Sequence, residues 1–405
     1  MSRNSQKPTV TVNKFPGLST VDDAVEVGHT GLVKAINVDI TRQQKIRRRK
    51  GATQKYAAVS TIDAACGFDN HLLLLQNDSL VNVVSDYTQS VVRSGLTPTK
   101  TLCALPVSAG EIIYSNGIET GRVVDGVDYE LGVQNPPKAV VSKALFGQMV
   151  AGRYQVAYTY VRSDGFESGC GVAAVFDLDQ DLSGLNIDVV ASTNIEVDQI
   201  SIYVTRPNGS TLYHAMTVDN LTATVRYNSH PNYLKRALRT QFKVPPPGFD
   251  VISRNDGRTM YAKDSVIYLS DPYDDEHITE GEAYFPFKSK VTMIGQVEGG
   301  TFVGTEKATH FIKGNTLEGA ELDTVAPYGA VMGTLTYIDG ALLGDGSVSD
   351  ILPAWMSHKG LCVGMPDGSV TNLTQNNVAI PEGLKGTSMF RQEDGQNHII
   401  SVIQK

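Results

Sequence analysis

The chain has 405 residues, of which 41% are hydrophobic and 19% charged, and its formal net charge is −8. This composition excludes a disordered chain, which would carry fewer apolar side chains and more net charge. The acidic balance argues against non-specific nucleic-acid binding by the whole surface. The length predicts one large repeat-built body or two to three domains.

Residues 1–14 have few apolar side chains and no turn signal, so we expect an extended N-terminal arm that becomes ordered against a neighbouring chain. Residues 1–10 are polar, which predicts no secretory signal. Further along, short alternating segments broken by Gly, Asn and Asp predominate, and long amphipathic helical patterns are almost absent. The sequence therefore predicts an all-β fold.

A unit of two strands joined by a tight polar turn recurs along the chain. It occurs at residues 71–84, 111–124, 259–269, 301–312 and 361–373. The turns contain Asn, Asp or Gly, which tolerate positive φ. Some units begin about 40 residues apart, the length of a four-stranded propeller blade. We therefore expect a β-propeller-like body, closed by residues 397–403 pairing with N-terminal strands near 35–39 or 45–49.

One stretch between these units has a different pattern. It follows Pro136 and Pro137 and contains strand-like segments at 152–161, 185–190, 199–206 and 222–227. Strands of this size within about 100 residues predict an inserted immunoglobulin- or fibronectin-like β-sandwich. The predicted domains are the arm (1–14), the first part of the propeller (15–137), the sandwich (138–228) and the second part of the propeller (229–405).

The strongest charge feature is a basic strand, which we take as the candidate subunit interface or DNA-channel site. Its cationic residues are Lys45, Arg47, Arg48, Arg49 and Lys50. They would pair with acidic groups of a neighbouring subunit, contact DNA phosphates, or guard a solvated edge strand against aggregation. Contact with a neighbouring subunit is the hypothesis that we carry forward.

Two acidic clusters invite comparison with calcium sites. The first contains Asp271, Asp274, Asp275, Glu276 and His277, and the second contains Asp177, Asp179 and Asp181. We interpret the first as a solvent-facing turn, although its close carboxylates could hold a cation. The second departs from a calcium loop, because Leu182 stands where Gly is needed and Asp188 where Glu is needed. We expect no metal site and no cofactor.

No motif for catalysis is present. The sequence has no nucleophile elbow, zinc-protease motif or phosphate-cradling loop, and its one tryptophan, Trp355, is not in a sialidase-type repeat. Four separated cysteines without a C-x-x-C pair predict buried, reduced thiols. The longest aliphatic run, residues 72–75, is too short to span a bilayer. We expect a non-enzymatic structural protein; the alternatives are a receptor- or glycan-binding propeller and a glycoside-cleaving propeller.

The N-terminal region resembles the opening of many tailed-phage structural proteins. The matching segments are Phe-Pro-Gly-Leu-Ser-Thr-Val-Asp-Asp at 15–23, Gly-Leu-Val-Lys-Ala-Ile-Asn-Val-Asp-Ile at 31–40 and Lys-Ile-Arg-Arg-Arg-Lys-Gly at 45–51. In those proteins a Gly-Leu-Asn start leads to an Asn-Val-Asp strand and a basic strand; here Ser19 replaces the usual Asn. The most similar group is the tail hub or nozzle protein, also called the packaged-DNA stabilisation or tail tubular protein.

The resemblance implies a homo-oligomer in the virion tail. Such a protein would be made in the host cytoplasm and would form a hexameric ring stacked on adaptor or tail-tube proteins. Its central channel would conduct or retain the genomic DNA, with passing contact, up to DNA ejection.

Overall fold

The computed structural model describes residues 17–22, 26–27, 31–41, 43–51, 53–68, 71–314, 320–343, 350–374, 377–381, 384–393 and 396–404. Within these ranges the regular elements are β-strands and two short 3-10 helices, η1 (Pro231–Tyr233) and η2 (Gly340–Leu343). The all-β prediction is therefore confirmed. The predicted arm, residues 1–14, lies outside the described residues.

The chain divides into two compact units. Unit 1 comprises Met1–Val59, Asp264–Val266 and Pro286–Lys405, and unit 2 comprises Ser60–Lys263 and Ile267–Phe285. Neither η1 nor η2, the helices of the described ranges, is long and apolar enough to cross a membrane.

Three sheets of unit 2 are built mainly from strands that follow one another in the chain. The first comprises β3 (Ile62–Phe68), β4 (His71–Gln76), β5 (Ser79–Val84) and β6 (Gln89–Arg93). The second comprises β7 (Cys103–Ser108), β8 (Glu111–Ser115), β9 (Thr120–Val124) and β10 (Val127–Tyr129). The third comprises β18 (Lys243–Val244), β19 (Val251–Asn255), β20 (Arg258–Lys263), β21 (Val266–Asp271), β22 (Asp274–Thr279) and β23 (Tyr284–Pro286). In the third sheet, however, β18 pairs with β22. The hairpins predicted at 71–84, 111–124 and 259–269 are confirmed.

The turn residues of these hairpins adopt the backbone conformation that their chemistry favours. Asn77 and Asp264 have φ of 57° and 51°, in the left-handed region that Asn and Asp tolerate better than most residues. Leu73, Leu74 and Leu75 in β4 are at most 2% exposed, so both faces of that strand are covered. Burial on both faces explains why β4 is a continuous aliphatic run without alternation.

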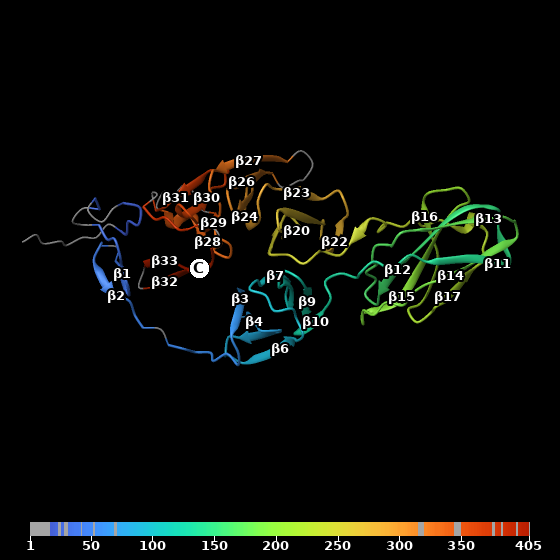
Figure 1. The fold of residues 1–405 in the computed structure, drawn as a ribbon, viewed down its shortest axis with the longest axis horizontal. Coiled ribbons are helices and arrows are strands. Elements are labelled where there is room, and N and C mark those ends of the chain that lie inside the picture. The colour runs from blue at the N-terminus through green and yellow to red at the C-terminus, as the bar shows by residue number, and fades with distance from the viewer. Residues whose placement is uncertain are drawn as a thin grey trace, which may run out of the picture. The chain divides into compact units, whose positions relative to one another are not determined.

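Seven described strands of unit 2 form two further sheets around one core (Figure 1, green). The three-stranded sheet comprises β11 (Val140–Met149), β14 (Ser183–Asp188) and β17 (Thr224–Tyr227). The four-stranded sheet comprises β13 (Ala174–Leu178), β12 (Gly152–Arg162), β15 (Val197–Thr205) and β16 (Leu212–Asp219). Tyr154, Val156, Tyr158 and Tyr160 alternate along β12 into the shared core. The predicted strands near 152–161, 185–190, 199–206 and 222–227 are therefore present.

Unit 1 contains two four-stranded antiparallel sheets and two two-stranded hairpins in its described residues. The sheets comprise β24 (Val291–Val297), β25 (Gly300–Thr305), β26 (Thr309–Lys313) and β27 (Glu321–Ala326), and β28 (Thr336–Asp339), β29 (Ile351–Ser357), β30 (Gly360–Gly364) and β31 (Val370–Asn372). The hairpins predicted at 301–312 and 361–373 are confirmed. Trp355, Phe302 and Phe311 pack together in the core that these two sheets share.

The C-terminal strand differs from our expectation. We expected residues 397–403 to pair with N-terminal strands, but β33 (Gln396–Gln404) pairs antiparallel with β32 (Lys385–Glu393). The N-terminal strands β1 (Val38–Ile40) and β2 (Ile46–Arg48) pair with each other instead. Two strands that are adjacent in the chain need only a short loop to pair, which costs less loop-closure entropy than pairing the two ends of the chain. Closure of the propeller-like body stays a prediction.

Candidate functional site

The predicted basic strand is β2 and its flanking residues, and it forms a hairpin with β1. Asp39 lies opposite Arg47 in the register, and the Arg49 Nε donates a hydrogen bond to Asp39 Oδ1 at 3.0 Å. This hydrogen bond lowers the pKa of Asp39 below its usual value. Arg49 thus interacts within the hairpin, and the Lys45 and Arg48 side chains are exposed.

Very little of this hairpin is buried. Asp39 is the one buried residue among the six residues of the strands β1 and β2. Apolar side chains in and next to the strands are open to solvent, with Ile36 68% exposed and Ile46 38% exposed. A two-stranded hairpin is marginally stable in water unless it packs against something else. The exposed apolar and basic side chains therefore form a surface suited to contact with another chain.

The acidic cluster at 271–277 is not the solvent-facing turn that we expected. Asp274, Asp275, Glu276 and His277 belong to strand β22, and His277 is 5% exposed. Each carboxylate has a polar partner within the chain. Asp271 pairs with Lys243, Asp275 with Arg254 and Glu276 with Arg162 at 2.6 Å, and Asp274 Oδ2 lies 2.7 Å from Nδ1 of His277 on the same strand. A cation site would require these carboxylates to give up their partners.

Arg162 is at the centre of a buried ionic network in unit 2. Its side chain is 4% exposed, and its two terminal nitrogens donate to Glu276 Oε2 at 2.6 Å and Oε1 at 2.9 Å. It also donates to both carboxylate oxygens of Asp164, at 3.2 and 2.7 Å. Arg122 joins the network by donating to Glu196 Oε1 at 2.5 Å. Bidentate arginine–carboxylate pairs fix orientation as well as distance, so the network holds strands β12 and β22 in a defined arrangement.

Aromatic rings extend this network on one side. The Arg162 guanidinium lies 4.3 Å from the ring centre of Phe166, and Phe166 stacks on the His277 ring at 4.4 Å. The His277 Nδ1 is 2.7 Å from Asp274 Oδ2. Sequence reasoning singled out Asp274, Glu276 and His277 but missed the network, because Arg162 and Glu276 are 114 residues apart and no motif indicates their contact.

The second acidic run lies at the surface, in and just after strand β13, with Asp177 and Asp179 side chains 79% and 76% exposed. Lys143 Nζ is 2.6 Å from Asp179 Oδ1, and Asp181 accepts a hydrogen bond from the backbone N–H of Ala151 at 2.6 Å. Among the described residues, no group of three or more His, Cys, Asp or Glu side chains is arranged to hold a metal ion.

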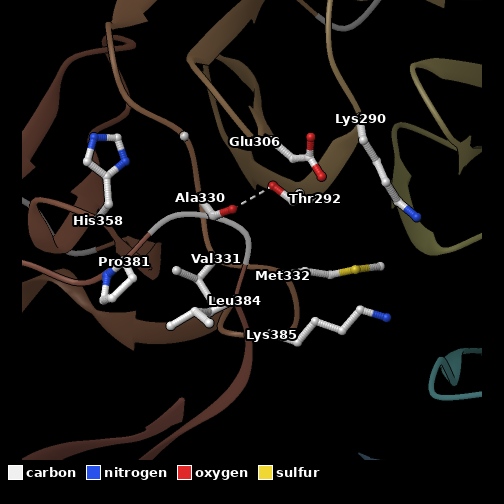
Figure 2. A pocket seen from close by; sticks show the side chains of 11 residues that line it. Lys290, Thr292, Glu306, Ala330, Val331, Met332, His358, Pro381, Leu384 and Lys385 are labelled. Carbon is white, nitrogen blue, oxygen red and sulfur yellow. Dashed lines mark hydrogen bonds between the residues drawn. The ribbon is translucent and has the colours of Figure 1, made fainter. Parts of the chain in front are cut away.

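A small cavity lies within unit 1, beside the ends of strands in both four-stranded sheets. Its volume is about 130 Å³, and Figure 2 shows Lys290 and Lys385 extending toward the same side, with His358 on the opposite side. Pockets that bind drug-sized ligands have volumes of roughly 300–1,000 Å³. The cavity could therefore hold little more than a small ion or a few water molecules.

The polar groups around this cavity take part in structural bonds. Thr292 Oγ1 donates to the carbonyl of Ala330 at 2.7 Å (Figure 2), and the N–H of Glu306 donates to the carbonyl of Lys290 at 3.0 Å. A Cβ added to Gly329 would lie 2.1 Å from the carbonyl oxygen of Thr305, so close packing requires glycine there. The cavity is a gap left where the strands pack, and nothing in its geometry indicates a catalytic or ligand-binding role.

The comparisons with known proteins give no close relative. No family model matches the sequence, and the search of curated proteins gives no match. A streptogramin B lyase structure is 11% identical, with 81% of this chain and 88% of that chain covered at a TM-score of 0.30. BBS1N, crystallised in complex with ARL6DN, is 9% identical, with 82% and 84% covered at a TM-score of 0.29. The extracellular domain of the hybrid two component system BT4673 from B. thetaiotaomicron is 9% identical, with 83% of this chain and 40% of that chain covered at a TM-score of 0.30. TM-scores this low carry no argument about function.

Proposed function

We propose that this chain is a structural subunit of a larger assembly, and that the assembly is a ring in the tail of a bacteriophage. The observation that carries the proposal is the exposed basic hairpin β1–β2. It has one buried residue in its strands, and it presents Ile46 and Arg48 to solvent. A neighbouring chain would supply the packing that such a hairpin needs.

The phage assignment rests on the resemblance of residues 15–51 to tail hub and nozzle proteins. The Arg-Arg-Arg segment of that resemblance lies at the end of β2 and just after it. By the same resemblance the ring is a hexamer that joins neighbouring tail or adaptor proteins and conducts or retains DNA. Surface salt bridges are weak in water, so a multivalent ring with many repeated contacts is the form in which these contacts would be stable.

The mechanical role follows from the strand architecture. In this proposal the four-stranded sheets form a propeller-like body, and their backbone ladders make a rigid wall around a channel. The net charge of −8 per chain would let DNA pass such a wall without adhering to it. The acidic surface thus suits a conduit, and the basic hairpin would contact a protein neighbour.

Light scattering coupled to size-exclusion chromatography tests this proposal. A structural ring subunit should give a mass that is a multiple of the chain mass and that falls on dilution. A protein that stays monomeric at every concentration, alone and mixed with neighbouring tail proteins, would overturn the proposal. A sample that is shown to be folded by circular dichroism is required for either conclusion.

A further inference from the structure

The two sheets of unit 2 that share one core, β11–β14–β17 and β13–β12–β15–β16, form a module with an exposed apolar tip (Figure 1, green). Three large apolar side chains make up this tip and are 69%, 82% and 73% exposed: Leu145, Phe146 and Leu182. The first two lie in the bulge that interrupts the pairing of β11 with β14, and the third directly precedes β14. The N–H of Gly147 donates to the carbonyl of Leu182 at 2.9 Å, so the two segments are joined at the tip.

The backbone of the apolar tip is strained. Phe146 and Leu182 have φ of 64° and 56°, in the left-handed region that bulky side chains rarely adopt. Neighbouring groups hold this conformation. The Arg226 guanidinium donates to the carbonyl oxygen of Phe146 at 2.8 Å, and a Cβ added to Gly147 would lie 2.2 Å from the carbonyl oxygen of Ser183. Strained residues of this kind cluster at functional sites, and here the strain displays two large apolar side chains to solvent.

The opposite end of the module carries a second apolar patch. Leu182 precedes β14, and the loop that follows β14 belongs to this other end. Three large apolar side chains are 55%, 88% and 86% exposed here and form what we call the loop patch: Val190, Ile195 and Leu221. The buried Asn220 joins the two loops that carry them, because its side chain accepts from the N–H of Ser192 at 2.8 Å and donates to the carbonyl of Ser192 at 3.1 Å.

We propose that the apolar tip of one copy docks on the loop patch of the next copy. This inference rests on the proposed assembly and names the partner surfaces within it. A second copy fits because the exposed charges beside the two patches are opposite. Arg226 lies at the tip, and Asp198 and Asp219 lie beside the loop patch.

The same charges disfavour the symmetric contacts. Two tips in contact would bring two copies of Arg226 together, and two loop patches would bring four aspartates together, whereas tip on loop patch places opposite charges side by side. Asp181, next to the tip, is exposed but already accepts a hydrogen bond from the N–H of Ala151 at 2.6 Å. The charge pattern therefore favours a head-to-tail contact, which generates a ring when the rotation closes.

The size of the contact fits a repeated assembly better than an isolated dimer. Three large apolar side chains present on the order of 400 Å² on each patch. The two patches together would bury about 800 Å², below the roughly 1,200–2,000 Å² of stable pairwise interfaces. A ring repeats the contact around its axis, and this multivalency would supply the stability that one contact lacks.

Cysteine cross-linking in the full chain tests the contact. The double variant Phe146→Cys/Leu221→Cys places one thiol on the tip and one on the loop patch, so oxidation with copper phenanthroline in air should give a ladder of covalent multimers on a non-reducing gel. Phe146→Cys and Leu221→Cys alone should give only the background of the wild type. The matched control is Val175→Cys/Leu221→Cys, because Val175 is 47% exposed on β13, away from both patches.

Phe146→Asn separates docking from folding. Asparagine tolerates the left-handed conformation better than phenylalanine, so thermal unfolding by circular dichroism should show an unchanged or higher melting temperature. The lost apolar contact should raise the concentration at which half of the protein is assembled by about tenfold, measured by light scattering over a dilution series.

A ladder confined to the tip-and-patch double variant, together with weakened assembly of stable Phe146→Asn, supports the inference. If the wild type assembles but no ladder forms, if Phe146→Cys alone cross-links as well as the double variant, or if Phe146→Asn assembles normally, the docking is wrong while the proposed assembly stands. A wild type that never assembles overturns both.

Discussion

Replacement of Arg162 gives a direct test of the ionic network that links β12 to β22. In Arg162→Ala, the Glu276 carboxylate loses two hydrogen bonds, of 2.6 and 2.9 Å, but keeps the one from the N–H of Gly132 at 2.9 Å and its ion pair with Arg122 at 3.6 Å. Removal of one partner from a buried ion pair typically costs about 3–5 kcal/mol. Because Glu276 keeps part of its compensation, we expect the free energy of unfolding to fall by about 3 kcal/mol, the lower end of that range.

Arg153→Ala is the matched control for this change. Arg153 is on the same strand, and it lies 3.9 Å from Asp177 with side chains 67% and 79% exposed. Exposed pairs of this kind contribute about 0–1 kcal/mol. Arg162→Lys keeps the charge but loses the bidentate geometry. Its decrease in the free energy of unfolding should therefore lie between those of Arg162→Ala and Arg153→Ala.

Urea denaturation followed by circular dichroism measures all three variants, and the midpoint and slope give the free energy of unfolding. If Arg162→Ala costs no more than Arg153→Ala, the network does not stabilise unit 2 and our reasoning about it is refuted.

Three further predictions concern the core and the pH dependence. Trp355 is fully buried, so Trp355→Ala should lose about 3–5 kcal/mol in urea denaturation and Trp355→Phe clearly less; equal losses would contradict tight packing. The hydrogen bonds from Arg162 lower the pKa of Asp164 below its usual value of 3.8. The contribution of Asp164 to the stability of the fold is therefore present above pH 3.8, and it is lost as the pH falls through the lowered pKa of the folded state. Asp164→Asn should therefore be less stable than the wild type at neutral pH but not in strong acid, as thermal melts at both pH values would show. Burial raises the pKa of Tyr227 from 10.0 to about 12, so its contribution to stability is lost as pH rises through that range. Tyr227→Phe should therefore remove tyrosinate absorbance that develops near pH 12 in folded protein; loss of absorbance that develops near pH 10 would refute this.

Much of the strand order could be predicted because it is local. The five predicted hairpins were confirmed, since a dipeptide such as Asn77-Asp78 between two apolar segments determines both the turn and the pairing of its neighbours. The pairing of β33 was wrong, although a local signal was present. Asp394-Gly395 stands between β32 and β33 in the sequence, and this dipeptide favours a two-residue hairpin turn.

The buried network could not be predicted, because it depends on contacts between distant residues. Glu276 meets Arg162 across 114 positions of sequence, and nothing in the local pattern of either residue indicates the other. An acidic cluster read in isolation looks solvated, since its partners lie elsewhere in the chain. The basic strand was located correctly as a strand, but its partner surface is not a property of the local sequence.

Negative-stain electron microscopy of the purified full chain tests the central claim most directly. The account predicts closed rings with one rotational symmetry in class averages, because the subunits of a ring repeat one head-to-tail contact around a rotation axis. Single particles of one chain at every concentration, with the protein shown to be folded, would contradict it.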